Sequence, residues 1–134
     1  MAKESGLGMT VSVDDSGTSL RDISNDITGI DFSTPRGTAD ITGLDKSGIE
    51  RLLLLADGQV TINGIFNDAG NMSHAVFKTV SSASVTRTVT IAVSGQTLSM
   101  EMLLSDYALS RASTGELTWS VTGLLQSGAV PTWA

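Results

Sequence analysis

The sequence predicts a mainly β fold: an antiparallel β-sandwich or barrel with one flanking α-helix and a long protruding loop. Ser and Thr make up 34 of the 134 residues, with 14 Gly and only 2 Pro, and this composition favours strands joined by tight turns. Apolar and polar residues also alternate in several segments, which indicates half-buried strands. Hydrophobic residues account for 40% of the chain, enough for one buried core, so we expect a single domain over residues 1–134.

The first strands follow from this alternation. Residues 9–13 alternate between apolar and polar, which predicts a strand with one buried face. Asp14-Asp15-Ser16-Gly17 then has the composition of a turn. Residues 20–23 predict a short strand, and residues 28–34 alternate again.

The next segment is polar, contains Pro and Gly, and has no apolar face of its own. It predicts a long exposed loop or a projecting hairpin. Its residues are Ser33, Thr34, Pro35, Arg36, Gly37, Thr38, Ala39 and Asp40. Residues 41–44 are expected to return the chain to the body of the domain.

A helix is predicted over residues 46–56. Asp45 can cap its first turn and Gly58 can end it. The apolar residues between them follow helical spacing: Ile49, Leu52, Leu53 and Ala56. Apolar period two then predicts a strand that contains Val60, Ile62, Gly64 and Phe66. A second, shorter helix is predicted over residues 72–80.

The second half of the chain predicts two further strand pairs. Val85, Val89, Ile91 and Val93 share one face of a strand. Arg87 interrupts that apolar face, so we expect it near the end of the strand. Ser94-Gly95-Gln96 turns the chain into a partner strand over residues 98–104. A third strand over residues 107–111 leads into a fourth, with Leu117, Trp119 and Val121 inward.

No catalytic, cofactor-binding or metal-binding site is predicted. The chain has no Cys and a single His, which leaves no thiolate and no ligand cluster for zinc. His74 has no recognisable nucleophile and orienting partner, and is expected at a surface helix start. Glu101 with Glu116 or Asp106 would be the carboxylate pair of a hydrolase, but Glu101 lies on the polar face of a predicted strand. We therefore expect no enzymatic activity and no cofactor.

The charge argues against binding to nucleic acids and membranes. The net charge is −6 with only eight Lys and Arg, and these are too scattered to form a basic groove for phosphates. The longest apolar run is Leu52-Leu53-Leu54-Leu55-Ala56, far shorter than the ~20 residues that span a bilayer. An acidic surface of this kind favours solubility and repels DNA and anionic lipid.

Four short motifs occur in a fixed order along residues 9–133. Asp22-Ile23-Ser24 precedes the strand at residues 28–34, and Asp40-Ile41-Thr42-Gly43 follows the polar segment. A strand motif comes next, Gly58-Gln59-Val60-Thr61-Ile62-Asn63-Gly64-Ile65-Phe66-Asn67-Asp68, and the chain ends on a Gly128, Pro131 and Trp133 pattern. Their order and spacing resemble those of the tail tube (major tail) proteins of long-tailed bacteriophages, including prophage and gene-transfer-agent relatives.

This resemblance implies a structural subunit of the virion. Such subunits form rings, usually hexameric, that stack into a hollow tube through which DNA is delivered without specific binding. The expected partners are other copies of the chain and the tape-measure, tail-terminator and distal-tail proteins. Assembly would take place in the cytoplasm of the bacterial host, with no membrane involved. Among tailed phages the resemblance favours siphophages.

The resemblance also assigns roles to parts of the chain. The loop between the early strands, residues 33–40, would reach a neighbouring ring. The sheets of adjacent subunits would join and line the lumen, and their polar faces are the candidates for the lining: Thr86, Thr88, Thr90, Ser99 and Glu101. A ring of six subunits would carry a charge of −36 (6 × −6), which suits a wall that must let DNA slide.

Composition leaves one alternative open. A virion decoration protein or an adhesin-like β-sandwich binding module would have the same Thr, Ser and Gly content. The polar segment at residues 33–40 and the strand motif after Gly58 favour the tail tube subunit.

Overall fold

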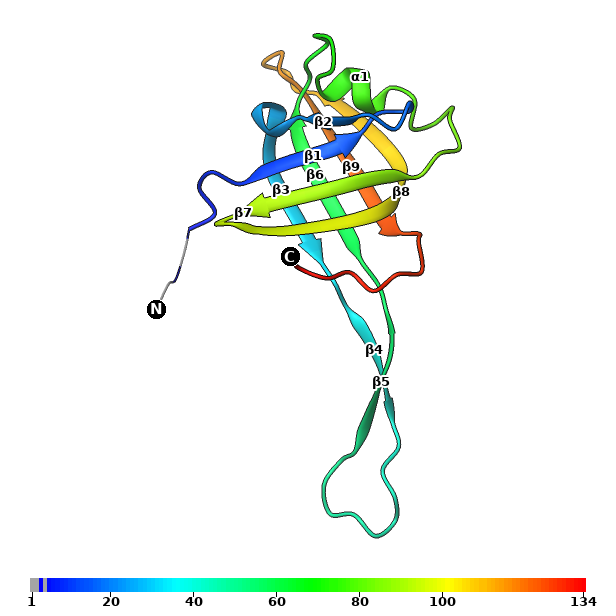
Figure 1. Cartoon of the computed structure of the whole chain (residues 1–134). Coiled ribbons are helices and arrows are strands. Elements are labelled where there is room, and N and C mark those ends of the chain that lie inside the picture. The colour runs from blue at the N-terminus through cyan, green and yellow to red at the C-terminus, as the bar shows by residue number, and fades with distance from the viewer. Residues whose placement is uncertain (1–2, 4) are drawn as a thin grey trace.

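A computed structural model describes residues 3 and 5–134 and confirms the mainly β class (Figure 1). A seven-stranded antiparallel sheet has the order β2-β1-β7-β8-β9-β6-β3, and β4 and β5 form a separate two-stranded ribbon. The strands are β1 (Thr10–Asp14), β2 (Leu20–Asp22), β3 (Ile27–Ser33), β4 (Arg36–Asp40), β5 (Arg51–Ala56), β6 (Gln59–Ile65), β7 (Arg87–Val93), β8 (Gln96–Arg111) and β9 (Leu117–Leu125). The helices are the 3-10 turn η1 (Ser24–Asp26) and α1 (Ser73–Phe77).

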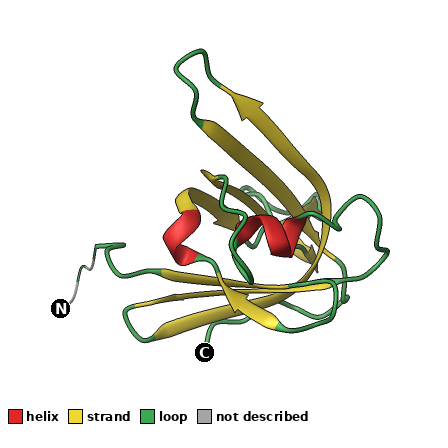
Figure 2. Ribbon diagram, turned by 90° about the horizontal axis from the view of Figure 1, so that it is seen from above, coloured by secondary structure: helices red, strands yellow, loops and turns green. Residues whose placement is uncertain are grey.

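The sheet folds into a sandwich because β8 takes part in both layers. Residues 96–102 of β8 pair with β7, and residues 102–111 pair with β9. The register shifts between Leu104 and Asp106, and a bulge of this kind bends a strand. The first layer is β2, β1, β7 and the first half of β8, and the second layer is the second half of β8 with β9, β6 and β3. Figures 1 and 2 show the two layers crossing.

The sequence predicted separate strands at residues 98–104 and 107–111, and this is wrong. The chain continues as one strand of 16 residues. The polar pair Ser105-Asp106 interrupts the apolar alternation in the same way that a turn would, although here it marks the bulge. The other predicted strands are present, with β2 shortened to Leu20–Asp22.

The core lies between the two layers. The first layer contributes Val11, Val13, Val89, Ile91, Leu98 and Met100, and the second contributes Val60, Ile62, Met102, Trp119 and Val121. Helix α1 closes one end of the sandwich with Val76 and Phe77, which are fully buried. The rings of Phe77 and Trp119 lie 5.0 Å apart between centroids. No helix in the described part of the chain is long and apolar enough to cross a membrane.

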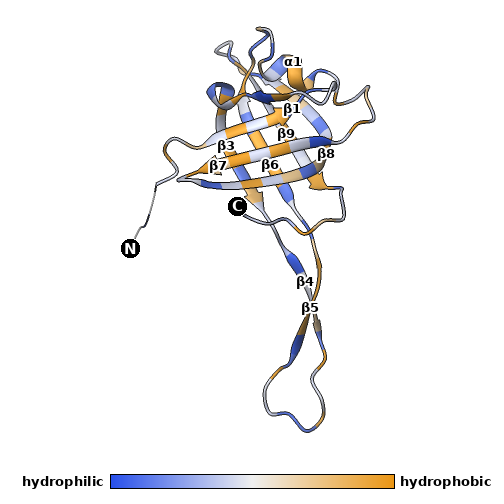
Figure 3. Ribbon diagram, in the orientation of Figure 1, coloured by the Kyte–Doolittle hydropathy of each residue, from blue (hydrophilic) through white to orange (hydrophobic). Residues whose placement is uncertain are grey.

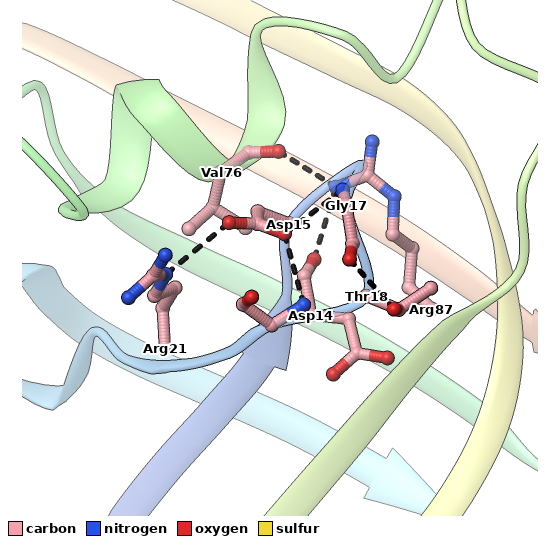
Figure 4. A network of polar contacts seen from close by, with 8 residues as sticks. Asp14, Asp15, Gly17, Thr18, Arg21, Val76 and Arg87 are labelled. Atoms are coloured by element: carbon pink, nitrogen blue, oxygen red, sulfur yellow. Dashed lines mark hydrogen bonds and ion pairs between the residues drawn. The ribbon is translucent and has the colours of Figure 1, made fainter.

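Arg87 fastens the α1 segment to the first layer. It is the first residue of β7, as its place on an apolar face predicted, and it is 1% exposed. Its guanidinium donates to the carbonyls of Asp14 (3.0 Å) and Val76 (2.7 Å) and to the hydroxyl of Thr79 (3.0 Å). Figure 4 shows the bonds to Asp14 and Val76. These acceptors satisfy a charge that would otherwise be costly to bury.

The turn after β1 is confirmed. The Asp15 carboxylate accepts hydrogen bonds from the amides of Gly17 (2.9 Å) and Ser19 (3.0 Å), and from Arg21 (3.2 Å) (Figure 4). The Ser19 amide is the main cause that lowers the pKa of Asp15. This Asx-type turn explains the acidic residues at this position without a bound ion.

The predicted helix over residues 46–56 is wrong, whereas the shorter one is confirmed. Residues 51–56 form strand β5, and the residues before it form a loop. Four successive leucines fit period 3.6 and period two equally well, and pairing with β4 decides for the strand. The helix predicted at residues 72–80 is present as α1. The buried Asp26 carboxylate accepts a hydrogen bond from the Ser73 amide in its first turn (2.9 Å).

We expect Gly64→Ala to destabilise the domain. A Cβ at this position would collide with the carbonyl oxygen of Asp26 and the indole of Trp119, and neither can move without disturbing the core. Overpacking of this kind costs about 1–3 kcal/mol. Urea unfolding measures the loss. The matched control is Gly29→Ala, where an added Cβ meets nothing within 4 Å, and an equal loss in both variants would contradict the prediction.

Candidate assembly interface

Strands β4 and β5 project from the body as an arm, defined here as residues 34–57 (Figure 1). The Asp57 amide donates to the Pro35 carbonyl (2.8 Å) and closes the base of the arm. The predicted polar segment, residues 33–40, ends β3 and supplies the first strand of the arm. Of the two shapes that its composition allowed, the projecting hairpin is the correct one.

Both faces of the arm carry exposed leucines. Leu53 pairs with Thr38, and Leu52 pairs with Ala39. Because successive side chains of a strand point to opposite sides, one face carries Leu53 and Leu55 and the other carries Leu52 and Leu54. These four leucines are 43–90% exposed, and Figure 3 shows hydrophobic colour on β5, away from the core, beside hydrophilic segments of β4. A ribbon of this kind has no apolar partner within its own described chain, which marks it as a binding surface.

The tip of the arm has a defined structure. Asp40 accepts hydrogen bonds from the amide (3.0 Å) and the hydroxyl (2.5 Å) of Thr42. The Thr42 hydroxyl oxygen in turn accepts from the Glu50 amide (2.9 Å), and the Ile41 amide donates to the Glu50 carbonyl (3.0 Å). The Asp40-Ile41-Thr42-Gly43 motif therefore holds the two sides of the tip together. Exposed apolar side chains lie around it: Ile41, Leu44 and Ile49.

The two layers differ at their edges. In the first layer, β2 covers β1, and the C-terminal segment covers the first half of β8. The amides of Thr97 and Ala134 donate to each other's carbonyls (2.9 and 2.8 Å), and Leu98 forms a bridge with Trp133. In the second layer, no described strand pairs with the outer side of β3 or with the side of residues 103–111 that faces away from β9. The second layer therefore has two open edges, which can pair with another sheet.

The two central rows of the outward face of the second layer are polar and small, whereas exposed Leu103, Leu124 and Ile65 lie in the rows that flank them. The register places Asp31, Thr61, Thr122 and Asp106 in one row across all four strands. A second row contains Asn63, Ser120 and Ala108. Asp31 and Asp106 are the acidic residues of these rows, and no Lys or Arg occurs in either of them.

The residues predicted to line a lumen lie on the other layer. Thr88, Thr90, Ser99 and Glu101 share its outward face, where Thr88 donates to Glu101 (2.7 Å) and the hydroxyls of Thr90 and Ser99 are 3.0 Å apart. Thr86 precedes β7 and lies outside the ladder. The structure thus brings four of the five residues together, and their facing a lumen remains a prediction.

The groups considered for chemistry have structural partners instead. His74 is half-buried, with Nδ1 at 3.2 Å from the Tyr107 hydroxyl, so its predicted surface position is only partly correct. Glu101 accepts from Thr88, and Glu116 accepts from the Thr114 hydroxyl in the β8–β9 turn. Within residues 3 and 5–134, no group of three or more His, Asp or Glu side chains is arranged to hold a metal ion.

Comparison with known proteins shows a likeness of structure. No family model and no curated protein matches the sequence. A chain from the tail of an empty gene transfer agent particle with C6 symmetry matches with a TM-score of 0.78 and 14% identity, over 98% of this chain and 99% of that one. A chain from the virion of a native gene transfer agent particle matches with 0.78 and 13%, over 98% and 99%.

A third match is a chain from the six-fold symmetrised baseplate of the anti-feeding prophage. Its TM-score is 0.65 and its identity 12%, over 100% of this chain and 97% of that one. This chain has the fold of these particle proteins. The matches cover 98–100% of this chain, and so include the arm, and 97–99% of the other chains. The resemblance predicted from the sequence is therefore confirmed at the level of the fold, although sequence identity is low.

The order of the arm tip should depend on pH through Asp40. The Thr42 hydroxyl and then its amide lower the pKa of Asp40 below its ordinary value of 3.8. A lowered folded-state pKa means that the tip bonds are intact above 3.8, and that they are lost only as the pH falls through that lowered pKa. NMR titration of the Asp40 carboxyl measures its protonation, and titration of the Thr42 and Glu50 amides measures the loss of the tip hydrogen bonds.

Thr42→Val is the matched variant for this titration. It removes the hydroxyl that is the first cause of the shift, so the pKa of Asp40 should rise toward 3.8. Equal titration of Asp40 in the two proteins would show that Thr42 does not organise the tip.

Proposed function

We propose that this chain is a tail tube subunit that polymerises into stacked rings, which form a hollow conduit for DNA. The observation that carries the proposal is the arm, since its leucines are exposed on both faces and find no cover in their own chain. An arm of this kind stabilises an assembly and is a liability in a monomer. The fold shared with a gene transfer agent tail of C6 symmetry supports six subunits per ring.

Ring closure would use the second layer. Its two open edges, β3 and the second half of β8, lie at opposite sides of four paired strands. If β3 of one subunit paired with β8 of the next, the layers would join into a closed barrel without an edge. The first layer offers less for such a joint, because β2 is an edge strand of only three residues and the C-terminal segment covers the first half of β8.

The lumen would then be lined by the outward face of the second layer. Its Thr, Ser and Asn side chains are small, and its charges are acidic, as in the row of Asp31, Thr61, Thr122 and Asp106. Such a wall gives phosphates no cation to bind, so DNA can slide along it. The open edges favour this face over the one that contains Thr88, Thr90, Ser99 and Glu101.

This role brings further expectations. The subunit would be a non-enzymatic component of the virion, as in a siphophage tail, and would assemble in the host cytoplasm. Tape-measure, tail-terminator and distal-tail proteins would contact the tube along its lumen and at its two ends. DNA would pass through the tube without specific binding.

Removing the arm should abolish stacking and preserve the fold. Residues 36–56 can be replaced by Gly-Gly, because Pro35 and Asp57 already meet at the base of the arm. Negative-stain electron microscopy over a concentration series should show rings and hollow tubes for the intact chain and no tubes for the variant. Circular dichroism should show that the body is still folded. Normal tubes from the variant would refute the role of the arm. An intact chain that stays monomeric at every concentration would favour a decoration or adhesin-like module.

Cysteine labelling can decide which face lines the lumen. The chain has no Cys, so Thr122→Cys on the second layer and Thr90→Cys on the first layer each introduce a single thiol. In assembled tubes, a bulky polyethylene glycol maleimide should label Thr90→Cys and fail to reach Thr122→Cys, whereas both should react in the monomer. The opposite pattern would place the lumen at the face predicted from the sequence.

A further inference from the structure

The exposed leucines on both faces of the arm set a condition on the partner that binds it. If the arm lay flat on one surface, only one pair of leucines would be covered, either Leu53 and Leu55 or Leu52 and Leu54. The other pair would stay in water and would add nothing to the free energy of binding. Covering both faces requires a site with two walls.

The body has a site with two apolar walls. β1 and β3 are not neighbours in the sheet, so the sandwich is open between the start of β1 and the first half of β3. This cleft is lined by Leu7, Met9 and Val11 on one side and by Ile27 and Ile30 on the other. Leu7 is 89% exposed at its rim, whereas Val11 is buried in its floor. The cleft runs beside the open edge of β3, which is the edge proposed to join neighbouring subunits.

A subunit's own arm cannot fill this cleft. The arm continues from the end of β3 at Ser33, whereas the cleft lies beside the beginning of the strand at Ile27. Figure 1 shows the arm pointing away from the body along the direction of β3 and β6. Two copies stacked head to tail along that direction would place the arm of one beside the end of the other where β3 begins.

Charge also permits this contact. Residues 36–56, the arm without its base, contain three basic and three acidic residues and are neutral, and the remaining residues carry the whole net charge of −6. This neutral part of the arm approaches an acidic body without the repulsion that opposes two acidic surfaces.

We infer that the cleft between Leu7–Val11 and the first half of β3 receives the arm of a copy in the neighbouring ring. The partner is a second copy of this chain, and the arm binds with leucines against both walls. The inference rests on the proposed function, and it adds the receiving site.

Cross-linking between two single-cysteine variants tests the contact. Leu53→Cys in the arm is mixed with Leu7→Cys at the rim of the cleft, and a short bis-maleimide is added after assembly. Both positions are exposed, so neither substitution should affect folding. Tubes should yield the mixed dimer. The matched control replaces Leu7→Cys by Leu20→Cys, which is 51% exposed on β2 and outside the cleft, and should yield little.

The outcomes separate the two proposals. Tubes in which the arm does not cross-link to Leu7→Cys, or cross-links equally to Leu20→Cys, would overturn the cleft as the receiving site and leave the tail tube function intact. If the intact chain formed no tubes at any concentration, the function would fail, and the inference would fail with it.

A charge at the rim provides a second measurement. Leu7→Glu should raise the protein concentration needed for tubes by at least about tenfold, because a carboxylate would have to be buried against the arm. Leu20→Glu should leave that concentration unchanged, and thermal melting should be the same for both variants. Tubes from Leu7→Glu at the normal concentration would overturn the inference.

Discussion

Strand β8 determines how the rest of the molecule is arranged, because it pairs with β7 over its first half and with β9 over its second. The bulge between Leu104 and Asp106 bends it where it leaves one layer for the other. That bend brings Met100 and Trp119 into one core, and it exposes the far side of residues 103–111. A single strand thus builds the hydrophobic interior and creates one of the two open edges. The same bend in β8 therefore stabilises the fold and provides an edge with which another sheet can pair.

Polar contacts hold the parts that hydrophobic packing alone would leave loose. Arg87 joins β7 to the end of β1 through the Asp14 carbonyl and to the α1 segment through the Val76 carbonyl and the Thr79 hydroxyl. Asp26, in η1, binds the first turn of α1. Asp40 has the corresponding role in the arm tip, where almost nothing apolar is buried. Each of these charged groups bonds to both backbone and side-chain atoms of the loops around it, so these loops need little core of their own.

Alternation in the sequence predicted the strands of the body well, because each has one face on the core and one in water. It failed at Leu52–Leu55, since these leucines are exposed and do not pack on the core, and four successive leucines fit two periods. The polar interruption at Ser105 gave no sign of whether the strand bends or ends. The sequence could not choose between the two faces proposed for a lumen, because Thr and Ser occupy the outward faces of both layers and the pairing at the edges is not visible in the sequence.

The arm leaves the body at one end only (Figure 1). A stack of the proposed kind would therefore be polar, with exposed arms on the last subunits at one end and vacant clefts at the other. The two extremities would therefore add subunits with unequal rates. A protein that caps the end with exposed arms would need an apolar groove that receives them. A protein that caps the end with vacant clefts would need an apolar projection that fills them. Directional elongation, with chemically distinct start and stop factors, would follow from the shape of a single hairpin.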